Sequence, residues 1–208
     1  MTTDANKAYQ MIKEKIISLE LAPGAVVQDH ELSGELGLGR TPIREALKLL
    51  EAESLVVTVP RRGIFVSHVS ITDLQQLCEI RVALEGLSSR LAAQRATDEE
   101  LAALRVCCDD QQLEQSVHIL ERIREDRRLH RVLAAATHNR FLEAEIERFY
   151  DLSLRLWHLA LGRVPAEAIR PGSHREILMA VVARDAERAE NLMREHIRDF
   201  QSKIKAAM

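Results

Sequence analysis

The segment Gly39–Leu50, with the sequence GRTPIREALKLL, constrains the architecture of this chain more than any other stretch. Its apolar residues recur at helical spacing and predict a helix over residues 41–53 with one apolar face. These residues are Ile43, Ala46, Leu47 and Leu50. We expect Thr41 to cap the helix and Pro42 to occupy its first position, where a missing N–H group costs nothing.

The opposite face of the same segment is basic. Arg40, Arg44 and Lys48 lie four residues apart and therefore share one side of the helix. A short helix with one apolar side, one basic side and a free N-terminus fits the major groove of DNA. An ordinary amphipathic helix with solvated arginines is the competing interpretation, and the flanking sequence has to decide between the two.

Two further helices are predicted before this segment, over residues 4–19 and 29–36. The first is followed by Pro23 and Gly24, which commonly end helices, and the second by Gly37, a residue typical of helix C-termini. Two short helices joined by a tight glycine turn form a helix-turn-helix. The segment 41–53 is therefore expected to be the second helix of that motif.

The chain then changes to short β-branched runs over residues 55–59 and 64–66, which flank a basic turn. Two such runs predict a β-hairpin, which at this place forms the wing of a winged helix. Arg61 and Arg62 at its tip can reach phosphates or the minor groove, and Gly63 allows close backbone approach. A solvent-exposed loop that is merely basic is the alternative interpretation.

The charge distribution restricts any contact with nucleic acid to this region. The chain of 208 residues has a net charge of -3, which excludes a general attraction to DNA. Residues 36–68, however, hold five lysine and arginine residues against three acidic ones. Hydrophobic residues make up 46% of the chain, enough for a core, and the aromatic content of 3% favours a helical, Leu/Ala-rich protein.

Cysteine usage and hydropathy indicate a cytoplasmic protein. Cys78, Cys107 and Cys108 are an odd set without a CxxC pair, so we expect buried, reduced thiols instead of disulfides or a zinc site. The N-terminus lacks the apolar region of a signal peptide, and no stretch approaches the roughly 20 apolar residues that span a bilayer.

After a linker at residues 67–70 the sequence is almost purely helical. Six helices are predicted near residues 72–94, 98–112, 116–137, 139–161, 173–183 and 185–206. Thr97 and Glu100 have the spacing of a capping box at the start of the second. We therefore expect a mostly α protein with two domains. Residues 1–69 form a winged helix-turn-helix with a small β-hairpin wing, and residues 70–208 an antiparallel, all-α helical bundle.

These segments resemble a known family. GRTPIREAL at residues 39–47, with LV at 55–56 and PRRGIFV at 60–66, resembles the DNA-binding domain of GntR-type bacterial transcription regulators. The C-terminal part resembles the FCD ligand-binding domain of their FadR branch. That resemblance is carried by DRRLH at residues 126–130, ATHN at 136–139, HREI at 174–177 and MREH at 193–196.

The chain departs from the family pattern at two positions. Gly39 replaces the usual serine, which would remove one phosphate contact, and Leu129 replaces the usual phenylalanine but stays apolar. Six C-terminal helices instead of seven resemble the VanR-like subgroup of the family.

The resemblance implies that helix 41–53 lies in the major groove of double-stranded DNA. Arg44 is then the best candidate for a bidentate contact with guanine and Arg40 the second, while Thr41 and Lys48 contact phosphates. Glu45 either directs a neighbouring arginine or is a plain surface residue. A homodimer would bind a palindromic operator, because each half-site requires one recognition helix.

The resemblance also implies a metal site formed by Asp126, His130, His174 and His196. Asp126 and His130 are four residues apart on one helix face, and the two later histidines lie on two later helices. One carboxylate and three imidazoles suit a divalent transition metal ion such as Zn²⁺, Ni²⁺ or Mn²⁺. Because the chain has eight histidines, spacing alone favours ordinary surface residues, and the metal site depends on the resemblance.

Two residues are candidates for binding an effector. Arg81 and Glu85 match the Arg-x-x-x-Glu pattern of the family. Arg81 either binds a carboxylate of the effector or is held by Glu85 in an ion pair, and both interpretations stay open. Asn139 is the second candidate contact, although capping the helix that follows is its more ordinary role.

Together these features predict a ligand-responsive transcription regulator, expected to be a repressor, which binds a metal ion and a small organic acid effector. A metal-dependent enzyme that acts on a small organic acid is the main alternative, because an open metal site can activate water. No general base is evident beside the site, and an enzyme would leave the N-terminal third without a role, so no catalytic residue is assigned. A purely architectural DNA-binding protein with a structural metal is a further alternative.

Overall fold

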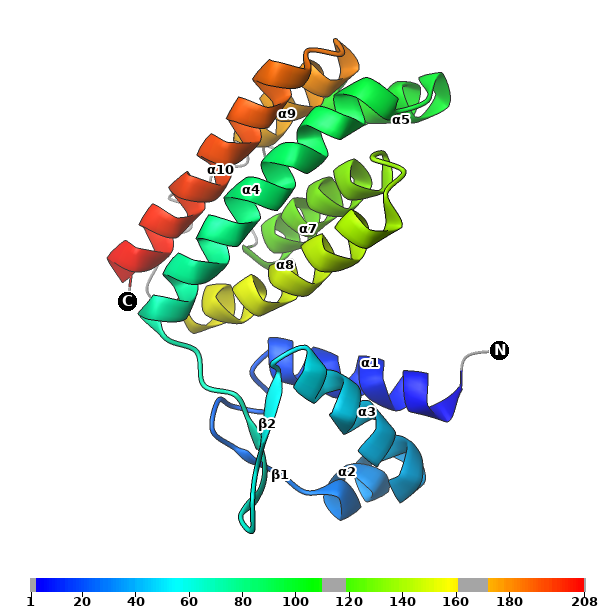
Figure 1. Ribbon diagram of the computed structural model, residues 1–208, viewed down its shortest axis with the longest axis vertical. Coiled ribbons are helices and arrows are strands. Elements are labelled where there is room, and N and C mark those ends of the chain that lie inside the picture. Colours follow the sequence, from blue (N-terminus) through cyan, green and yellow to red (C-terminus); the bar gives the residue numbers. More distant parts are fainter. Residues whose placement is uncertain (1–2, 110–118, 161–171, 208) are drawn as a thin grey trace. The chain divides into compact units, whose positions relative to one another are not determined.

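The computed structural model describes residues 3–109, 119–160 and 172–207 (Figure 1). The chain forms two compact units. One contains the residues up to Ser70 together with Leu154–Leu159, and the other starts at Ile71 and contains the rest. Each unit is described separately below.

The first unit begins with α1 (Asp4–Ile17), whose N-cap Thr3 accepts a hydrogen bond from the Asn6 amide at 3.3 Å. The apolar residues buried on its inner face are Ala8, Ile12, Ile16 and Ile17. The helix ends two residues earlier than predicted, and Leu19 just beyond it takes the left-handed conformation with a φ of 64°. Pro23 and Gly24 therefore belong to the loop and do not end the helix.

The helix-turn-helix consists of α2 (Asp29–Leu36) and α3 (Arg40–Ala52). Gly37 ends α2 with a φ of 64°, as predicted. The prediction that Thr41 caps α3 is wrong. Gly39 is the N-cap, since its backbone is extended and its carbonyl accepts from the Ile43 amide at 3.3 Å. Thr41 and Pro42 both lie in the first helical turn, where the missing N–H group of proline still needs no partner.

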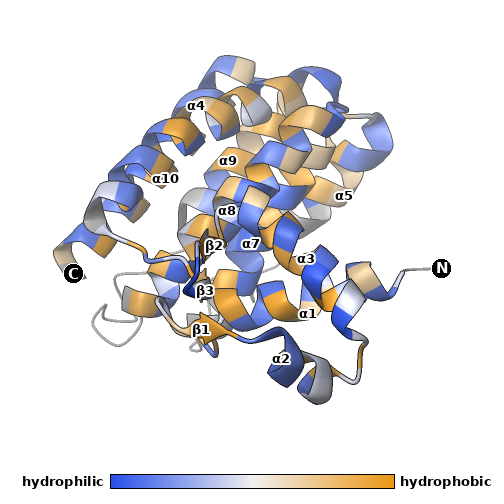
Figure 2. Ribbon diagram, turned by 60° about the horizontal axis from the view of Figure 1, so that its bottom comes forward, coloured by the Kyte–Doolittle hydropathy of each residue, from blue (hydrophilic) through white to orange (hydrophobic). Residues whose placement is uncertain are grey.

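The apolar face predicted for α3 is confirmed. Ile43, Ala46 and Leu50 are fully buried, and Leu47 is nearly so. α3 packs against α1 and contacts α2. Figure 2 shows that the ribbons of α1 and α3 alternate between hydrophobic and hydrophilic residues, as expected for helices that each place one face in a core. The basic face of α3 is thereby left exposed.

Three short strands form an antiparallel sheet in the order β1-β3-β2. β2 (Val56–Val59) and β3 (Gly63–Val66) form the predicted hairpin and pair along their whole length. The turn between them is closed by a hydrogen bond from the Arg62 amide to the Val59 carbonyl at 3.0 Å. β1 (Val26–Val27) pairs with β3 and was missed, because a strand of two residues shows no alternation that a sequence pattern could reveal.

The second unit is helical. Its described helices are α4 (Ile71–Arg95), α5 (Asp98–Asp109), α7 (Ile119–Ala135), α8 (Arg140–Ala160), α9 (Gly172–Val182) and α10 (Ala186–Ala207). Each predicted helix corresponds to one of these, and the predicted helical residues 110–112, 116–118 and 161 lie outside the described residues. α4 and α10 lie side by side and run in opposite directions (Figure 1).

Two local predictions for this unit are confirmed. The Thr97 hydroxyl accepts from the Glu100 amide at 3.2 Å, and the Glu100 carboxylate accepts from the Thr97 amide at 2.8 Å, which completes the capping box. Cys78 is a buried free thiol, and burial raises its pKa to about 11. The side chains of Cys107 and Cys108 lie outside the described residues. Within the described ranges, no helix is long and apolar enough to cross a membrane.

Candidate functional site

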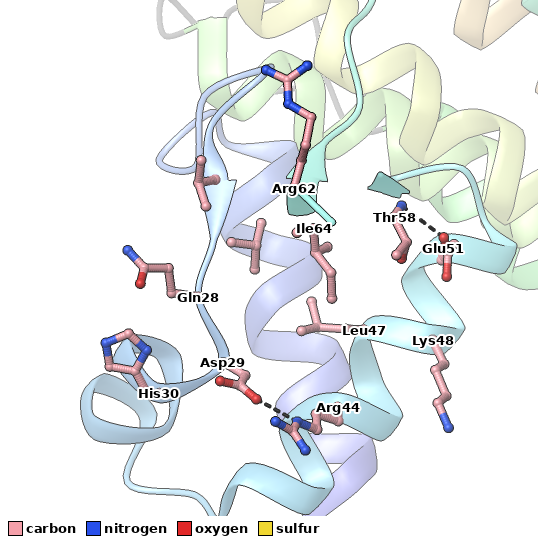
Figure 3. A pocket seen from close by; sticks show the side chains of 13 residues that line it. Gln28, Asp29, His30, Arg44, Leu47, Lys48, Glu51, Thr58, Arg62 and Ile64 are labelled. Atoms are coloured by element: carbon pink, nitrogen blue, oxygen red, sulfur yellow. Dashed lines mark hydrogen bonds and ion pairs between the residues drawn. The ribbon is translucent and has the colours of Figure 1, made fainter. Parts of the chain in front are cut away.

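A groove of about 590 Å³ lies on the first unit between α2, α3 and the hairpin (Figure 3). One wall is formed by residues 26–30, a second by four residues of α3 between Arg44 and Glu51, and a third by residues of the hairpin. The Thr58 amide of β2 donates a hydrogen bond to the Glu51 carboxylate at 2.9 Å. This bond ties the hairpin to α3.

Four of the seven residues predicted to contact DNA line this groove. They are Arg44, Lys48, Arg62 and Gly63. The remaining three, Arg40, Thr41 and Arg61, are exposed and lie within four positions of a lining residue in the chain. α3 and the hairpin therefore present a basic helix face and a basic turn at the same groove, as a winged helix requires.

The turn of the hairpin has an unusual backbone. Arg61 occupies the third position of the turn with a φ of 63°, where type II turns usually carry glycine. Gly63 follows with a φ of 109°, which L-residues with a side chain rarely adopt. The sequence thus places a basic side chain at the tip of the hairpin despite the conformational cost.

Asp29 at the start of α2 pairs with both arginines of the α3 entrance. Its carboxylate accepts from Arg40 Nη2 at 2.9 and 3.1 Å and from Arg44 Nε at 2.5 Å (Figure 3 shows the pair with Arg44). Arg44 and then Arg40 hold the pKa of the Asp29 carboxyl below its usual range. The acidic partner of these arginines is therefore Asp29, and Glu45 lies on the exposed surface of α3.

In the second unit, Asp126, His130 and His196 come together from α7 and α10. One possible ligand atom from each lies within 4.8 Å of the other two. His196 Nε2 is 3.2 Å from Asp126 Oδ1, and His130 Nε2 is 3.6 Å from Asp126 Oδ2. His130 and His196, which are 66 positions apart in the sequence, thus converge on the carboxylate of Asp126.

His174 of α9 joins the same cluster. Its Nε2 atom is 2.9 Å from Asp126 Oδ1, and its ring lies 4.9 Å from that of His196 between centroids. The structure therefore brings together all four residues predicted to bind a metal ion. The group of ligand atoms within 4.8 Å of one another is Asp126, His130 and His196, and His174 joins it through its contact with Asp126.

Glu85 lies behind His130 and was not assigned a role at the metal site. Its carboxylate forms an ion pair with His130 Nδ1, which leaves Nε2 directed to Asp126. A carboxylate on the second nitrogen of a metal-binding histidine fixes the ring and its tautomer. Burial alone would lower the pKa of His130, but Glu85 and Asp126 outweigh it and raise the pKa to about 9.

The Asp126 carboxylate is held by further contacts. Tyr150 of α8 donates its hydroxyl to Asp126 Oδ2 at 2.8 Å. Burial would raise the pKa of Asp126, but His130 and the hydrogen bonds from His174 and His196 lower it well below its ordinary range. Burial and then Asp126 raise the pKa of Tyr150 well above its ordinary value, so this phenol stays a hydrogen-bond donor.

Arg81 is buried and forms the ion pair with Glu85 that the sequence left open. Its Nε atom lies 2.5 Å from Glu85 Oε1, and its guanidinium lies over the ring of Tyr150 at 5.1 Å and that of Phe200 at 5.4 Å. Burial would raise the pKa of Glu85, but Arg81 and then His130 lower it to about 2. A contact between Arg81 and an effector stays a prediction.

Ser88 continues the helix face that carries Arg81 and Glu85, because residues 81, 85 and 88 lie on one side of α4. Its hydroxyl is buried and has no hydrogen-bond partner among the residues that the structure describes. An unsatisfied buried hydroxyl is costly, and a polar ligand on this side of α4 would supply the missing partner.

Asn139 caps α8. Its side-chain oxygen accepts from the amides of Phe141 at 3.2 Å and Leu142 at 3.3 Å. The capping role weighed in the sequence is therefore present. An additional contact with an effector stays a prediction.

The residues that sequence reasoning missed are Asp29, Tyr150 and Ser88, together with the role of Glu85 beside His130. Tyr150 and Asp126 are 24 positions apart, so no local spacing links them. Asp29 carried a weak signal in the sequence. It is an acidic residue at the start of the helix that precedes the one with Arg40 and Arg44, so a helix-turn-helix can bring the three together.

Two families match this chain. The family described as "Bacterial regulatory proteins, gntR family" matches residues 4–66, and "FCD domain" matches residues 76–199. The "HTH-type transcriptional repressor GlaR" of Escherichia coli (strain K12) is 29% identical over 207 residues, which cover 95% of this chain and 94% of that protein.

Other relatives match over shorter regions. The regulator YdhC of Bacillus subtilis (strain 168) is 30% identical over 148 residues, and the Nta operon transcriptional regulator of Aminobacter aminovorans is 40% identical over 89. These matches cover 69% and 43% of this chain, and 65% and 42% of the two relatives' own lengths. Among solved structures, E. coli McbR/YncC has the same fold, with a TM-score of 0.83, 23% identity and 99% of both chains covered.

Proposed function

This chain belongs to the GntR family of bacterial regulatory proteins and carries an FCD domain, and from that premise we propose that it is a repressor released from DNA by a small organic acid. It is a DNA-binding transcription regulator and not an enzyme, so the alternative of a metal-dependent enzyme is set aside. Repression is supported by GlaR and by RspR of E. coli, which are both named as transcriptional repressors.

The observation that carries the DNA-binding role is the groove between α3 and the hairpin, which is lined by basic residues of both elements. We assign Arg44 and Arg40 to base edges, because they project from the first two turns of α3. Thr41 and Lys48 contact phosphates. The wing residues Arg61, Arg62 and Gly63 contact the backbone or the minor groove.

Two substitutions test this assignment. Arg44→Ala is expected to cost about 1–3 kcal/mol on the operator and to relax its base preference, whereas Lys48→Ala weakens binding to all duplexes alike. The measurement is fluorescence anisotropy with two labelled duplexes. One is the sequence that the wild-type chain selects from a random library, and the other is its scrambled counterpart. Equal losses on both duplexes for Arg44→Ala would contradict base readout.

In the helical unit, we infer a site for a divalent transition metal ion on Asp126, His130, His174 and His196. The site fits such an ion because His130 Nε2 is buried, makes no hydrogen bond with any described residue and faces Asp126. A bound ion would offer an open coordination position to a carboxylate. The chain's own contribution is to hold the four ligands, through Glu85 behind His130 and Tyr150 on Asp126.

The effector is proposed to be a small organic acid whose carboxylate meets the metal ion. Arg81 adds positive charge beside the site, and the unsatisfied hydroxyl of Ser88 on the same face of α4 offers a hydrogen bond. Asn139 was the other candidate, and its side chain is occupied as a helix cap. Arg81 and Ser88 are therefore the better supported contacts.

Thermal unfolding tests the metal and the effector together. Zn²⁺, Ni²⁺ or Mn²⁺ is expected to raise the melting temperature of chelator-treated protein, since a ligand that binds the folded state at 100 times its Kd stabilises it by about 2.7 kcal/mol. His196→Ala should abolish this shift, while His138→Ala, which changes an exposed histidine, should preserve it. Carboxylic acids are then screened on the metal-loaded protein. A shift that persists in His196→Ala would contradict the site.

The functional unit is proposed to be a homodimer on a palindromic operator. One exposed face of α4 carries Ile80, Ala83 and Leu87, with Glu79 at one end and Arg90 at the other. Two copies of α4 that cross about a two-fold axis would cover the apolar residues and place each glutamate near the arginine of the second copy, which also pairs with Glu190 of its own chain. Effector binding would favour a dimer whose recognition helices no longer match the half-site spacing.

A further inference from the structure

We propose that Asp29 is the positioning residue of the DNA-reading arginines, and that it sets the ratio between specific and non-specific DNA binding. The inference rests on the assignment of Arg44 and Arg40 to base edges given above. It adds an acidic residue, located on the first helix of the helix-turn-helix, to a function otherwise carried by basic side chains.

The contact between α2 and α3 places one carboxylate between two guanidinium groups. Arg40 and Arg44 are one helical turn apart, so their side chains are neighbours, and Asp29 accepts hydrogen bonds from both. The Asp29 side chain is only 18% exposed, whereas those of Arg40 and Arg44 are 57% and 62% exposed. The carboxylate is therefore fixed in the protein, and the two arginines are turned to it from the solvent side.

The pairing leaves the reading edge of Arg44 available. Asp29 uses only Nε of this guanidinium, and neither terminal nitrogen bonds to any other residue in the part of the chain that the structure describes. A bidentate contact with guanine needs two parallel N–H groups, and the terminal nitrogens supply them. Holding Arg44 at Nε thus fixes its direction and reduces the conformational freedom that DNA binding would otherwise have to remove.

The carboxylate also opposes indiscriminate binding. A phosphate attracts any arginine whatever the base sequence, and this attraction supplies most non-specific affinity. Asp29 cancels one of the two positive charges at the entrance of α3, and its lowered pKa keeps it charged at neutral pH. Binding to random DNA is therefore weakened, because its phosphates meet one positive charge fewer. Binding to the operator is weakened less, because hydrogen bonds between the arginines and a matching base offset the loss.

The test compares Asp29→Asn with Glu31→Gln by anisotropy on the library-selected duplex and its scrambled counterpart at several salt concentrations. Glu31→Gln is the matched control, since it also removes one negative charge and lies only two residues from Asp29. The Glu31 side chain pairs with Gln28 and not with an arginine. Asp29→Asn is expected to bind the scrambled duplex several-fold more tightly. Its ratio of specific to non-specific affinity should fall by about tenfold, and its salt dependence should steepen by about one unit.

The control should shift both duplexes by the same factor and leave the ratio unchanged. The proposal is overturned if Asp29→Asn keeps the wild-type ratio or behaves like Glu31→Gln. Asp29→Glu, which retains the charge, should keep the ratio within about threefold and guards against a variant that merely misfolds. The assignment of Arg44 is judged separately. If Arg44→Ala lowers operator affinity alone while Asp29→Asn changes no ratio, base readout stands and the role of Asp29 falls.

Discussion

At the scale of single residues, Arg61 is a charged side chain at a position where its backbone conformation is unfavourable. Left-handed backbone costs an ordinary L-residue roughly 1–2 kcal/mol, and Arg61 adopts it at the tip of the hairpin with a φ of 63°. Its side chain is exposed, so packing within the unit does not explain why arginine stands there. The proposed contact with DNA would explain it.

Arg61→Gly is therefore expected to move stability and binding in opposite directions. The free energy of unfolding should rise by up to about 1 kcal/mol, because glycine adopts this conformation without strain. Affinity for every DNA duplex should fall, because one charge is lost. Urea unfolding and anisotropy measure the two effects. Arg62→Gly is the control, which should weaken DNA binding without any gain in stability, since Arg62 is not in the left-handed region.

Glu85 is a second residue whose role depends on a neighbour. Glu85→Gln removes the carboxylate that orients His130, and loss of such a partner typically costs 10–100-fold in metal affinity. Competition between the protein and a chromophoric chelator for Zn²⁺ measures this effect. Glu79→Gln on the exposed side of α4 should leave the affinity unchanged. An unaltered affinity in Glu85→Gln would show that His130 needs no orienting partner.

At the scale of elements, Asn139 caps the start of α8, and two variants separate this role from contact with the effector. Asn139→Ala should lower the free energy of unfolding by about 1 kcal/mol, as for other lost N-caps. Asn139→Ser should restore most of it, because a hydroxyl can also accept from the first-turn amides. Chemical denaturation measures both. If Asn139→Ser restores stability but neither variant responds to carboxylic acids, Asn139 contacts the effector as well.

Elements with a local signal could be predicted from the sequence. The left-handed Gly37, the capping box of Thr97 and the apolar face of α3 are each specified within a few residues. The start of α3 was misplaced, because Thr41 is as good a cap in isolation as Gly39 and only the extended backbone before Arg40 decides between them. The strand β1 depends on pairing with β3 and carries almost no signal of its own.

The candidate sites divide in the same way. The four proposed metal ligands were singled out because a family pattern joins positions on three helices, which periodicity alone could not do. Glu85, Tyr150 and Asp29 act through contacts that span 11 to 45 positions in the sequence, and such contacts exist only once the helices have packed. A single sequence names the residues of a site more readily than the residues that orient them.

At the scale of the whole molecule, the proposed dimer depends on the exposed face of α4. Ile80 is 40% and Leu87 is 41% exposed, so a glutamate at either position can be accommodated in a monomer. Ile80→Glu and Leu87→Glu are expected to convert a dimer into a folded monomer and to weaken operator binding strongly, because one half-site would be lost. Analytical ultracentrifugation measures the assembly.

Phe141→Glu is the control for these variants. Phe141 is 70% exposed and belongs to α8, not to α4, so its replacement should leave a dimer formed through α4 intact. A wild-type chain that sediments as a monomer at micromolar concentration, or a dimer that survives both α4 substitutions, would exclude this face as the interface.

The length of α4 has a mechanical consequence. This single helix of 25 residues carries Arg81 and Glu85 on its buried side and the apolar residues offered to a second copy on its exposed side. A rod of this length measures about 37 Å, so a tilt of about 5° at one end displaces the other by about 3 Å. A ligand that rearranges only the few atoms around Glu85 could therefore tilt α4 and displace its far end. The displacement of the far end of α4 would then report binding of the proposed effector without any separate relay.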